Sequence, residues 1–114
     1  EAHPVFGSRL KRRLREGARL VVIDPRRIEL VGAPHIKSDY HLPVRPGANV
    51  ALLNAIAHTI VDEGLADLEF VDARCEKVAF TNWLTFIQQP ENSPEAMEVH
   101  TGVHAGDVRA AARL

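Results

Sequence analysis

Two residues that follow a short apolar run carry the side chains best suited to bind a nucleotide. Asp24 and Arg26 come directly after Ile23, at the end of a predicted strand. In parallel α/β sheets, ligands bind outside the carboxyl ends of the strands. A carboxylate there can accept hydrogen bonds from a ribose diol or from the N–H edge of guanine, and an arginine can bind phosphate or stack on a base. Asp24-Pro25 is also a plain turn sequence, and the spacing alone leaves both interpretations open.

A second candidate segment precedes a predicted helix. Gly47 allows the backbone to approach a ligand closely, and the N-terminus of the helix offers unpaired N–H groups to an anion. Asn49 can bind a base or a ribose, or it can serve only as the N-cap of the helix. A ligand loop and an ordinary capped turn are therefore both open here.

The first four residues, Glu1-Ala2-His3-Pro4, stand at the N-terminus of another predicted helix. This is also a place that favours phosphate, although His3 can be a plain cap residue. The chain has neither a Gly-x-Gly-x-x-Gly motif nor a P-loop, so an ordinary dinucleotide or ATP site lacks its fingerprint.

The other reactive side chains do not form a convincing constellation. His100 and His104 are four residues apart, but Gly102 breaks the helix that would align them, so we predict no metal site. Cys75 has no paired base, and we expect an inert, partly buried thiol. The basic run from Arg9 to Arg15 has no interleaved aromatic residue, so we expect a solvated helix face rather than a nucleic-acid site.

The order of the predicted helices and strands indicates an α/β fold with a parallel sheet and a mostly helical C-terminal half. Phe6, Leu10 and Leu14 form one apolar stripe that we expect to pack against the sheet. From the N-terminus we expect a helix over 4–16 that stops at Gly17, a strand within 18–23 buried on both faces, an irregular segment over 25–39, and a short strand over 40–44.

A helix over 50–63 is apolar nearly all round, which predicts packing on most sides. Its polar residues Asn54, His58 and Asp62 share one narrow stripe. The remainder predicts helices over 67–75, 77–88 and 104–114, with a turn from Ser93-Pro94 to about residue 100.

Length, composition and charge limit the number of domains and the kinds of partner that the chain can have. The 114 residues have room for one domain, and 46% hydrophobic with 25% charged residues is ordinary for a globular protein. A formal net charge of -1 and the lack of a long apolar run give no support to a nucleic-acid or membrane partner. The chain starts without Met and stops inside a helical pattern, so we expect an internal fragment of a longer chain.

Several segments in order resemble the molybdopterin oxidoreductase family and, within it, the formate dehydrogenase alpha (catalytic) subunits. The segments that carry this resemblance are Glu1-Ala2-His3-Pro4, the run from Gly17 to Ile23-Asp24-Pro25-Arg26-Arg27, the run from Leu42 through Arg45-Pro46-Gly47-Ala48-Asn49 to Asn54, then Glu63-Gly64-Leu65, Phe70-Val71, Arg74-Cys75-Glu76, Ser93-Pro94-Glu95, Thr101-Gly102-Val103 and Val108 to Arg113. The resemblance covers nearly the whole chain.

The resemblance implies a Rossmann-like domain that binds the guanosine end of a molybdopterin guanine dinucleotide (bis-MGD) on a molybdenum or tungsten centre. Residues 1–114 would be a single fragment of that domain, with a nucleotide-binding βαβ-type part over about 1–65 and a helical part over about 66–114. The residues expected to bind the cofactor are Glu1, Ala2, Ile23, Asp24, Arg26, Gly47 and Asn49.

The resemblance also implies a parent oxidoreductase that converts formate to carbon dioxide, with iron–sulfur clusters elsewhere, electron-transfer subunits as partners, NAD linkage and a cytoplasmic location. Cys75 is followed by Glu76, whereas the metal ligand of the family is followed by His, so we expect the isolated fragment to be inactive. A nitrate reductase type of the same family and a non-enzymatic helical interaction module are the alternatives.

Overall fold

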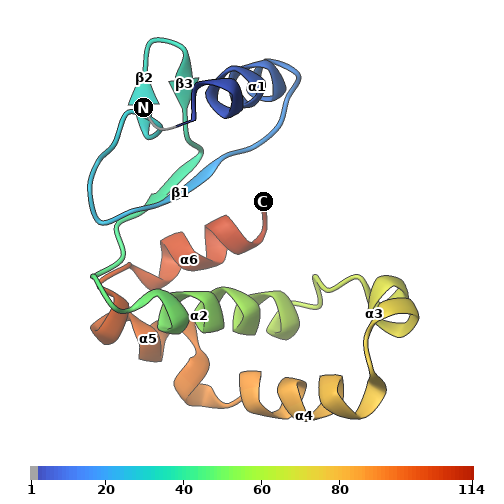
Figure 1. The fold of residues 1–114 in the computed structure, drawn as a ribbon. Coiled ribbons are helices and arrows are strands. Elements are labelled where there is room, and N and C mark those ends of the chain that lie inside the picture. The colour runs from blue at the N-terminus through green and yellow to red at the C-terminus, as the bar shows by residue number, and fades with distance from the viewer. Residues whose placement is uncertain (1–2) are drawn as a thin grey trace. The chain divides into compact units, whose positions relative to one another are not determined.

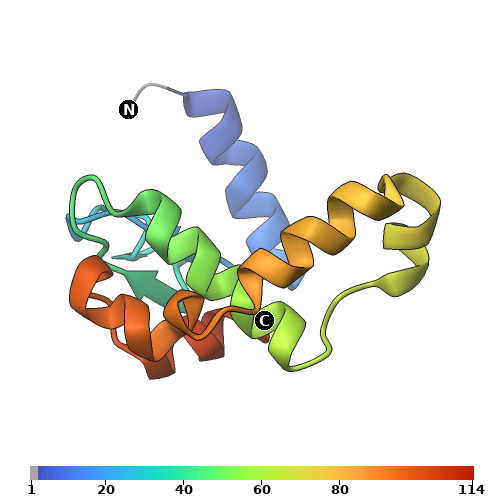
Figure 2. The ribbon, with the colours of Figure 1, turned by 90° about the horizontal axis from the view of Figure 1, so that it is seen from below.

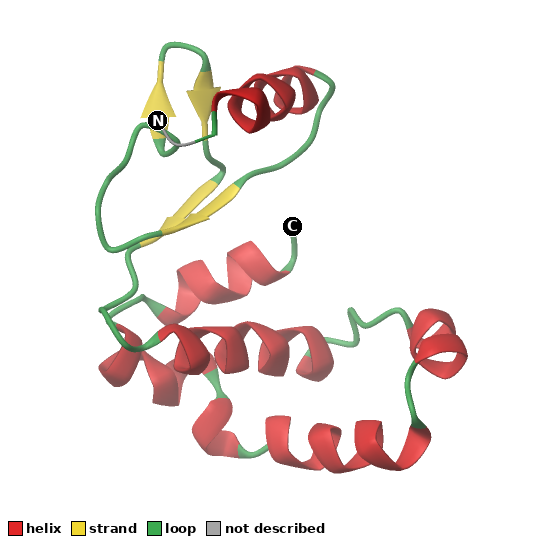
Figure 3. Ribbon diagram, viewed as in Figure 1, coloured by secondary structure: helices red, strands yellow, loops and turns green. Residues whose placement is uncertain are grey.

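The strand that carries the first candidate residues pairs with one partner. The computed structural model describes residues 3–114. In it, β1 (Val21–Ile23) runs parallel to β4 (Tyr40–Leu42), with Val22 opposite His41. β-branched side chains favour β1, and Pro43 ends β4 because it has no N–H to donate. The parallel pair and the mixed α/β class are confirmed (Figure 3).

The prediction that this strand is buried on both faces is wrong. Val22 is buried with 5% of its surface exposed, whereas its neighbour Ile23 is 43% exposed. Successive side chains of a strand point to opposite faces. An unbroken apolar run therefore does not by itself establish that both faces are covered.

Two further strands lie in the segment predicted to be irregular. β2 (Gly32–Ala33) and β3 (Ile36–Lys37) form an antiparallel hairpin closed by Pro34 and His35 (Figure 1). Strands of two residues are too short for an alternating pattern to be visible in the sequence, which is why the hairpin was missed.

Helix α1 (Pro4–Arg15) agrees with the prediction in extent but not in packing. Pro4 occupies the first turn, and Gly17 follows the helix with a φ of +95°. No residue of α1 is buried, and Phe6 is 62% exposed. The expected packing of its apolar stripe is therefore not seen in residues 3–114. The stripe only shows that α1 is amphipathic.

The chain divides into two compact units, Glu1–Pro43 and Val44–Leu114, and the second is helical. In this unit α2 (Asn49–Asp62) packs against α5 (Pro94–Thr101) and α6 (Ala105–Ala112). The core includes Leu52 and Ala55 of α2, Val103, and Val108 of α6, each about 1% exposed. Such burial is the main driving force for packing these helices.

The packing of α2 differs from the expectation on both of its faces. Val50 is 70% exposed and Leu53 57% exposed, so α2 is not covered on most sides. His58, in the predicted polar stripe, is instead buried, and its Nδ1 has no hydrogen-bond partner among the described residues. The hydrophobic pattern of an almost uniformly apolar helix does not define its buried face.

A helix replaces the turn expected over 93–100. The Ser93 hydroxyl accepts a hydrogen bond from the Ala96 N–H at 3.3 Å, Pro94 opens α5, and Gly102 ends it with a φ of +72°. A serine cap, an N1 proline and a C-terminal glycine are all typical of helix ends, so these residues favour a helix over the predicted turn. The last helix, α6, ends at Ala112, before the predicted end at 114.

Helices α3 (Leu68–Arg74) and α4 (Lys77–Ile87) confirm the two predicted helices in this region within a few residues. Figure 2 shows α4 running from the α2–α5–α6 packing out to α3. A 3₁₀ turn, η1 (Pro90–Asn92), joins α4 to α5. Among residues 3–114, no helix has the length and apolar content needed to cross a membrane.

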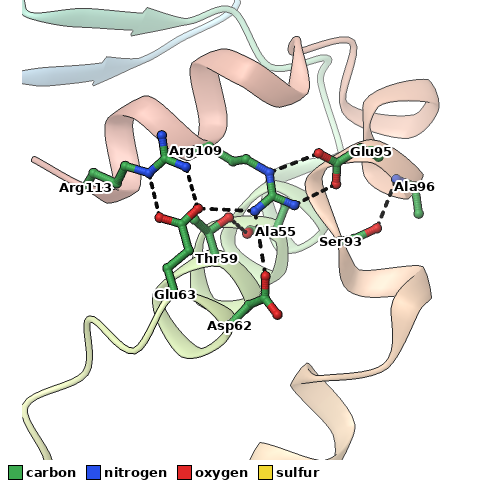
Figure 4. A network of polar contacts seen from close by, with 9 residues as sticks. All are labelled: Ala55, Thr59, Asp62, Glu63, Ser93, Glu95, Ala96, Arg109 and Arg113. Atoms are coloured by element: carbon green, nitrogen blue, oxygen red, sulfur yellow. Dashed lines mark hydrogen bonds and ion pairs between the residues drawn. The ribbon is translucent and has the colours of Figure 1, made fainter.

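Ion pairs join the three central helices of the second unit (Figure 4). Arg109 of α6 donates to Glu95 of α5 and, at 3.3 Å, to Glu63 at the end of α2. Arg113 donates to both carboxylate oxygens of Glu63. Hydrogen bonds from Arg113 lower the pKa of Glu63, and those from Arg109 lower the pKa of Glu95, so both carboxylates stay charged at neutral pH.

Candidate functional site

The end of β1 holds Asp24 in a tight polar turn. Its Oδ1 accepts the backbone N–H of Arg26 at 2.8 Å, and the Arg26 guanidinium contacts the same carboxylate at 3.2 and 3.3 Å. From the paired strand, His41 Nε2 donates to the Asp24 carbonyl oxygen at 2.8 Å. His41 lies in the short strand predicted over 40–44, and the parallel register brings its side chain to the end of β1.

The electrostatics of this strand end suit a polar ligand. The hydrogen bond from the Arg26 side chain lowers the pKa of Asp24, so the carboxylate is charged at neutral pH. The Asp24 side chain is 20% exposed, and that of Arg26 is 79% exposed. A carboxylate has about four acceptor positions, and Arg26 uses three. Asp24 therefore forms the turn that the sequence suggests, and its carboxylate still has one acceptor position free for a ligand.

The second candidate segment is a β-turn. The Ala48 N–H donates to the Arg45 carbonyl oxygen at 3.0 Å, Pro46 and Gly47 are the central residues, and Gly47 has a φ of +86°. A proline followed by a residue with positive φ is typical of a type II turn. A Cβ on Gly47 would meet nothing within 4 Å, so the backbone there is open to an approaching group.

Asn49 is not the N-cap that the sequence predicts. Helix α2 starts at Asn49 itself, Ala48 holds the cap position, and no side-chain hydrogen bond caps the helix. The turn closes at Ala48, so helical geometry begins at Asn49, one residue before the predicted helix start at residue 50. Asn49 is exposed, and its amide makes no capping hydrogen bond to α2.

The remaining predicted residues are distributed as follows. Glu1 and Ala2 lie outside the described residues, and His3 is the N-cap of α1 with no side-chain capping bond. Ile23, Asp24 and Arg26 lie together at the end of β1 in the first unit. Gly47 and Asn49 lie together at the start of α2 in the second unit.

The other groove and reactive side chains of the described residues do not form a second site. A groove of about 540 Å³ in the first unit is lined mainly by residues of α1 and of the β2–β3 hairpin, and none of the predicted site residues that the structure describes lines it. Cys75 is exposed at the end of α3, so the expectation of a partly buried thiol is wrong. His104 Nδ1 accepts the Gly106 N–H at 3.1 Å and caps α6. Across residues 3–114, no three metal-ligating side chains gather.

Comparison with known proteins identifies the family to which the chain belongs. Residues 1–101 match the family model described as "Molybdopterin oxidoreductase". The chain therefore belongs to the molybdopterin oxidoreductase family. This agrees with the resemblance seen in the Asp-Pro-Arg and Arg-Pro-Gly segments that the structure places at the two turns described above.

Particular relatives include enzymes of different activities. The chain is 36% identical to formate dehydrogenase H of Escherichia coli over all of this chain and 15% of that protein. It is also 36% identical to a nitrate reductase of Symbiobacterium thermophilum, over 99% of this chain and 15% of that protein. The solved structure of acetylene hydratase from Pelobacter acetylenicus superposes with a TM-score of 0.78 at 35% identity, covering 90% of this chain and 13% of that one. The chain thus spans about 15% of the length of the curated relatives that it matches.

Proposed function

We propose that this chain is the part of a formate dehydrogenase catalytic subunit that binds the guanosine end of a molybdopterin guanine dinucleotide. The observation that carries the proposal is the charged, partly exposed Asp24 carboxylate at the carboxyl end of a parallel strand, in a chain of this family. Ile23, Asp24 and Arg26 would contact the guanosine. Gly47 and Asn49 would contact the base or ribose. Glu1 and Ala2 would lie by the pyrophosphate or ribose.

The described residues fit such a ligand. The free acceptor position on Asp24 can take a ribose hydroxyl or a guanine N–H, and the exposed guanidinium of Arg26 can bind phosphate or stack on a base. Gly47 has open space at its Cα, and the first turn of α2 has no side-chain cap. Its N–H groups can therefore face an anion or water.

When bound, the cofactor would supply the metal centre at which formate loses two electrons to become carbon dioxide. The residues of this chain would hold and orient the nucleotide end, as proteins do for cofactors generally. The remainder of the catalytic subunit, the iron–sulfur clusters and electron-transfer subunits would complete the enzyme, in the cytoplasm and without a nucleic-acid or membrane partner. NAD linkage is also a proposal, and the relatives include an F420-dependent formate dehydrogenase subunit of Methanocaldococcus jannaschii, 43% identical over 76 residues.

A nitrate reductase type is the second candidate, because a nitrate reductase matches at the same 36% identity as a formate dehydrogenase. Formate oxidation and nitrate reduction by the full-length protein, each assayed with an artificial electron carrier, separate the two. Family membership disfavours a non-enzymatic helical module, which would contain no guanine nucleotide.

Two substitutions of Asp24 in the full-length protein test the nucleotide contact. Asp24→Ala removes the acceptor, so molybdenum and guanine content under limiting cofactor should fall by about tenfold. Asp24→Asn keeps an oxygen that can accept the Arg26 N–H, and therefore keeps the turn, but it removes the charge. Asp72→Ala removes an exposed carboxylate from α3 and is the matched control.

We expect cofactor loss in both Asp24 variants, an unchanged control, and melting temperatures close to wild type. If instead Asp24→Ala lowers the melting temperature with normal cofactor content, and Asp24→Asn behaves as wild type, then Asp24 is only a turn residue and the proposed contact is wrong.

A further inference from the structure

Arg45, the first residue of the turn before α2, is held at three points. Its backbone N–H donates to the Thr101 carbonyl oxygen at 2.9 Å, and its Nη1 donates to the Val99 carbonyl oxygen. Its own carbonyl oxygen accepts the Ala48 N–H that closes the turn. Arg45 therefore connects the C-terminal end of α5 with the start of α2, two elements far apart in the sequence.

Gly102 provides the space for this connection. A Cβ at position 102 would lie 2.9 Å from Nε of Arg45, closer than real Cβ contacts, and 3.1 Å from its Cγ, tighter than most of them. The φ of +72° that ends α5 separately favours glycine at this position. The Arg45 side chain thus lies across the Cα of Gly102, where any other residue would displace it.

The charge of Arg45 also suits its position. The last carbonyl groups of a helix carry partial negative charge and favour a cation. Because Arg45 is exposed, this attraction adds little to global stability. Its main consequence is geometric, since Pro46 restricts the turn and Arg45 fixes the turn to α5.

We propose that Arg45 is a positioning residue, which holds the 45–49 turn against the end of α5 so that Gly47 and Asn49 keep the geometry that receives the cofactor. The inference rests on the proposed function for the ligand of Gly47 and Asn49. The connection itself rests on the contacts of Arg45 with Val99, Thr101 and Gly102.

Hydrogen exchange in the full-length protein tests the connection without reference to activity. In Arg45→Ala, the amide of Ala48 should exchange about tenfold faster than in wild type, because the turn loses a charged anchor. Arg45→Lys should restore part of the protection, since its ammonium group can still donate to a carbonyl oxygen. Arg74→Ala, which removes an exposed arginine from α3, is the control and should not change Ala48 exchange.

Cofactor retention tests the role. The guanine dinucleotide should dissociate from Arg45→Ala about three- to tenfold faster after dilution, and Arg45→Lys should lie between Arg45→Ala and wild type. Gly102→Ala displaces the Arg45 side chain without removing it, so it should accelerate dissociation as well. In the Arg45→Ala background it should accelerate dissociation by less than in wild type, because the side chain that it displaces is gone and only the backbone strain of a non-glycine residue at a φ of +72° remains.

The outcomes are separable. Unchanged Ala48 exchange in Arg45→Ala overturns the connection, and faster exchange with unchanged dissociation overturns the positioning role. A wild-type protein that contains no guanine dinucleotide overturns the proposed function, and with it the ligand part of this proposal, while the exchange rates still decide whether Arg45 holds the turn.

Discussion

The guanidinium of Arg109 makes two parallel hydrogen bonds to the carboxylate of Glu95, with Nε–Oε1 and Nη2–Oε2 both 2.9 Å. This bidentate geometry joins α6 to the first turn of α5 (Figure 4). The Arg109 side chain is 24% exposed, so water screens it less than a free surface arginine.

Arg109→Ala should destabilise the chain by about 0.5–1 kcal/mol, because Glu95 loses its bidentate partner, whereas Glu63 keeps both hydrogen bonds from Arg113. Urea denaturation followed by circular dichroism measures this change. Arg74→Ala, on an exposed position of α3, should change the free energy of unfolding by less than about 0.5 kcal/mol. Equal effects of the two substitutions would contradict a stabilising role for the Arg109 pairs.

Stability should fall when the pH is lowered through the titration of Glu63 and Glu95. Hydrogen bonds from Arg113 and Arg109 lower the pKa of each carboxyl below the ordinary value of 4.5. The folded state therefore binds fewer protons than the unfolded state. The contribution is complete above the ordinary value and is lost as the pH falls through the lowered one. Urea midpoints measured from pH 7 to pH 3 should show this decline, and Arg109→Ala should flatten it. A decline of the same size in Arg109→Ala would rule out these ion pairs as its cause.

Two glycines should respond to alanine with opposite signs. Gly7 lies inside α1 with open space around its Cα and without a positive φ, so Gly7→Ala should stabilise by about 0.5–1 kcal/mol. Gly64 follows α2 with a φ of +66°, so Gly64→Ala should destabilise by about 1–2 kcal/mol through backbone strain alone. Urea denaturation compares the two, and a stabilising Gly64→Ala would show that the residue does not need the left-handed conformation.

Asp39 should control the start of the parallel pair. Its carboxylate accepts the Leu20 N–H and the Arg19 Nε, both at 2.7 Å, immediately before β1 and β4 begin. Asp39→Ala should raise the exchange rate of the Leu20 amide by about tenfold, since one charged acceptor is lost. Glu29→Ala, an exposed carboxylate in the same unit, serves as control. Unchanged protection of Leu20 would mean that the strand pairing does not need Asp39.

Much of the local structure was predictable because its signals are local. A β-branched run, Pro4 at a helix start, and the glycines at 17 and 102 each specify the backbone within a few residues, and α1, β1 and β4 lie where the sequence placed them. The parallel sheet was predicted from the succession of a helix, a tight turn and an apolar strand, which is typical of α/β units. The family was visible in the ordered turn segments around Asp24 and Gly47.

Long-range contacts were decided only in the tertiary structure. Which face of α2 is buried, the pairing of Arg109 with Glu63 and Glu95, and the path of Arg45 across Gly102 depend on where α5 and α6 return in space. The parallel register places His41 beside the end of β1, and no neighbouring residue in the sequence predicts its contact with Asp24. The physical reason is that turns and caps are set by neighbours along the chain, whereas burial and ion pairing are set by neighbours in space.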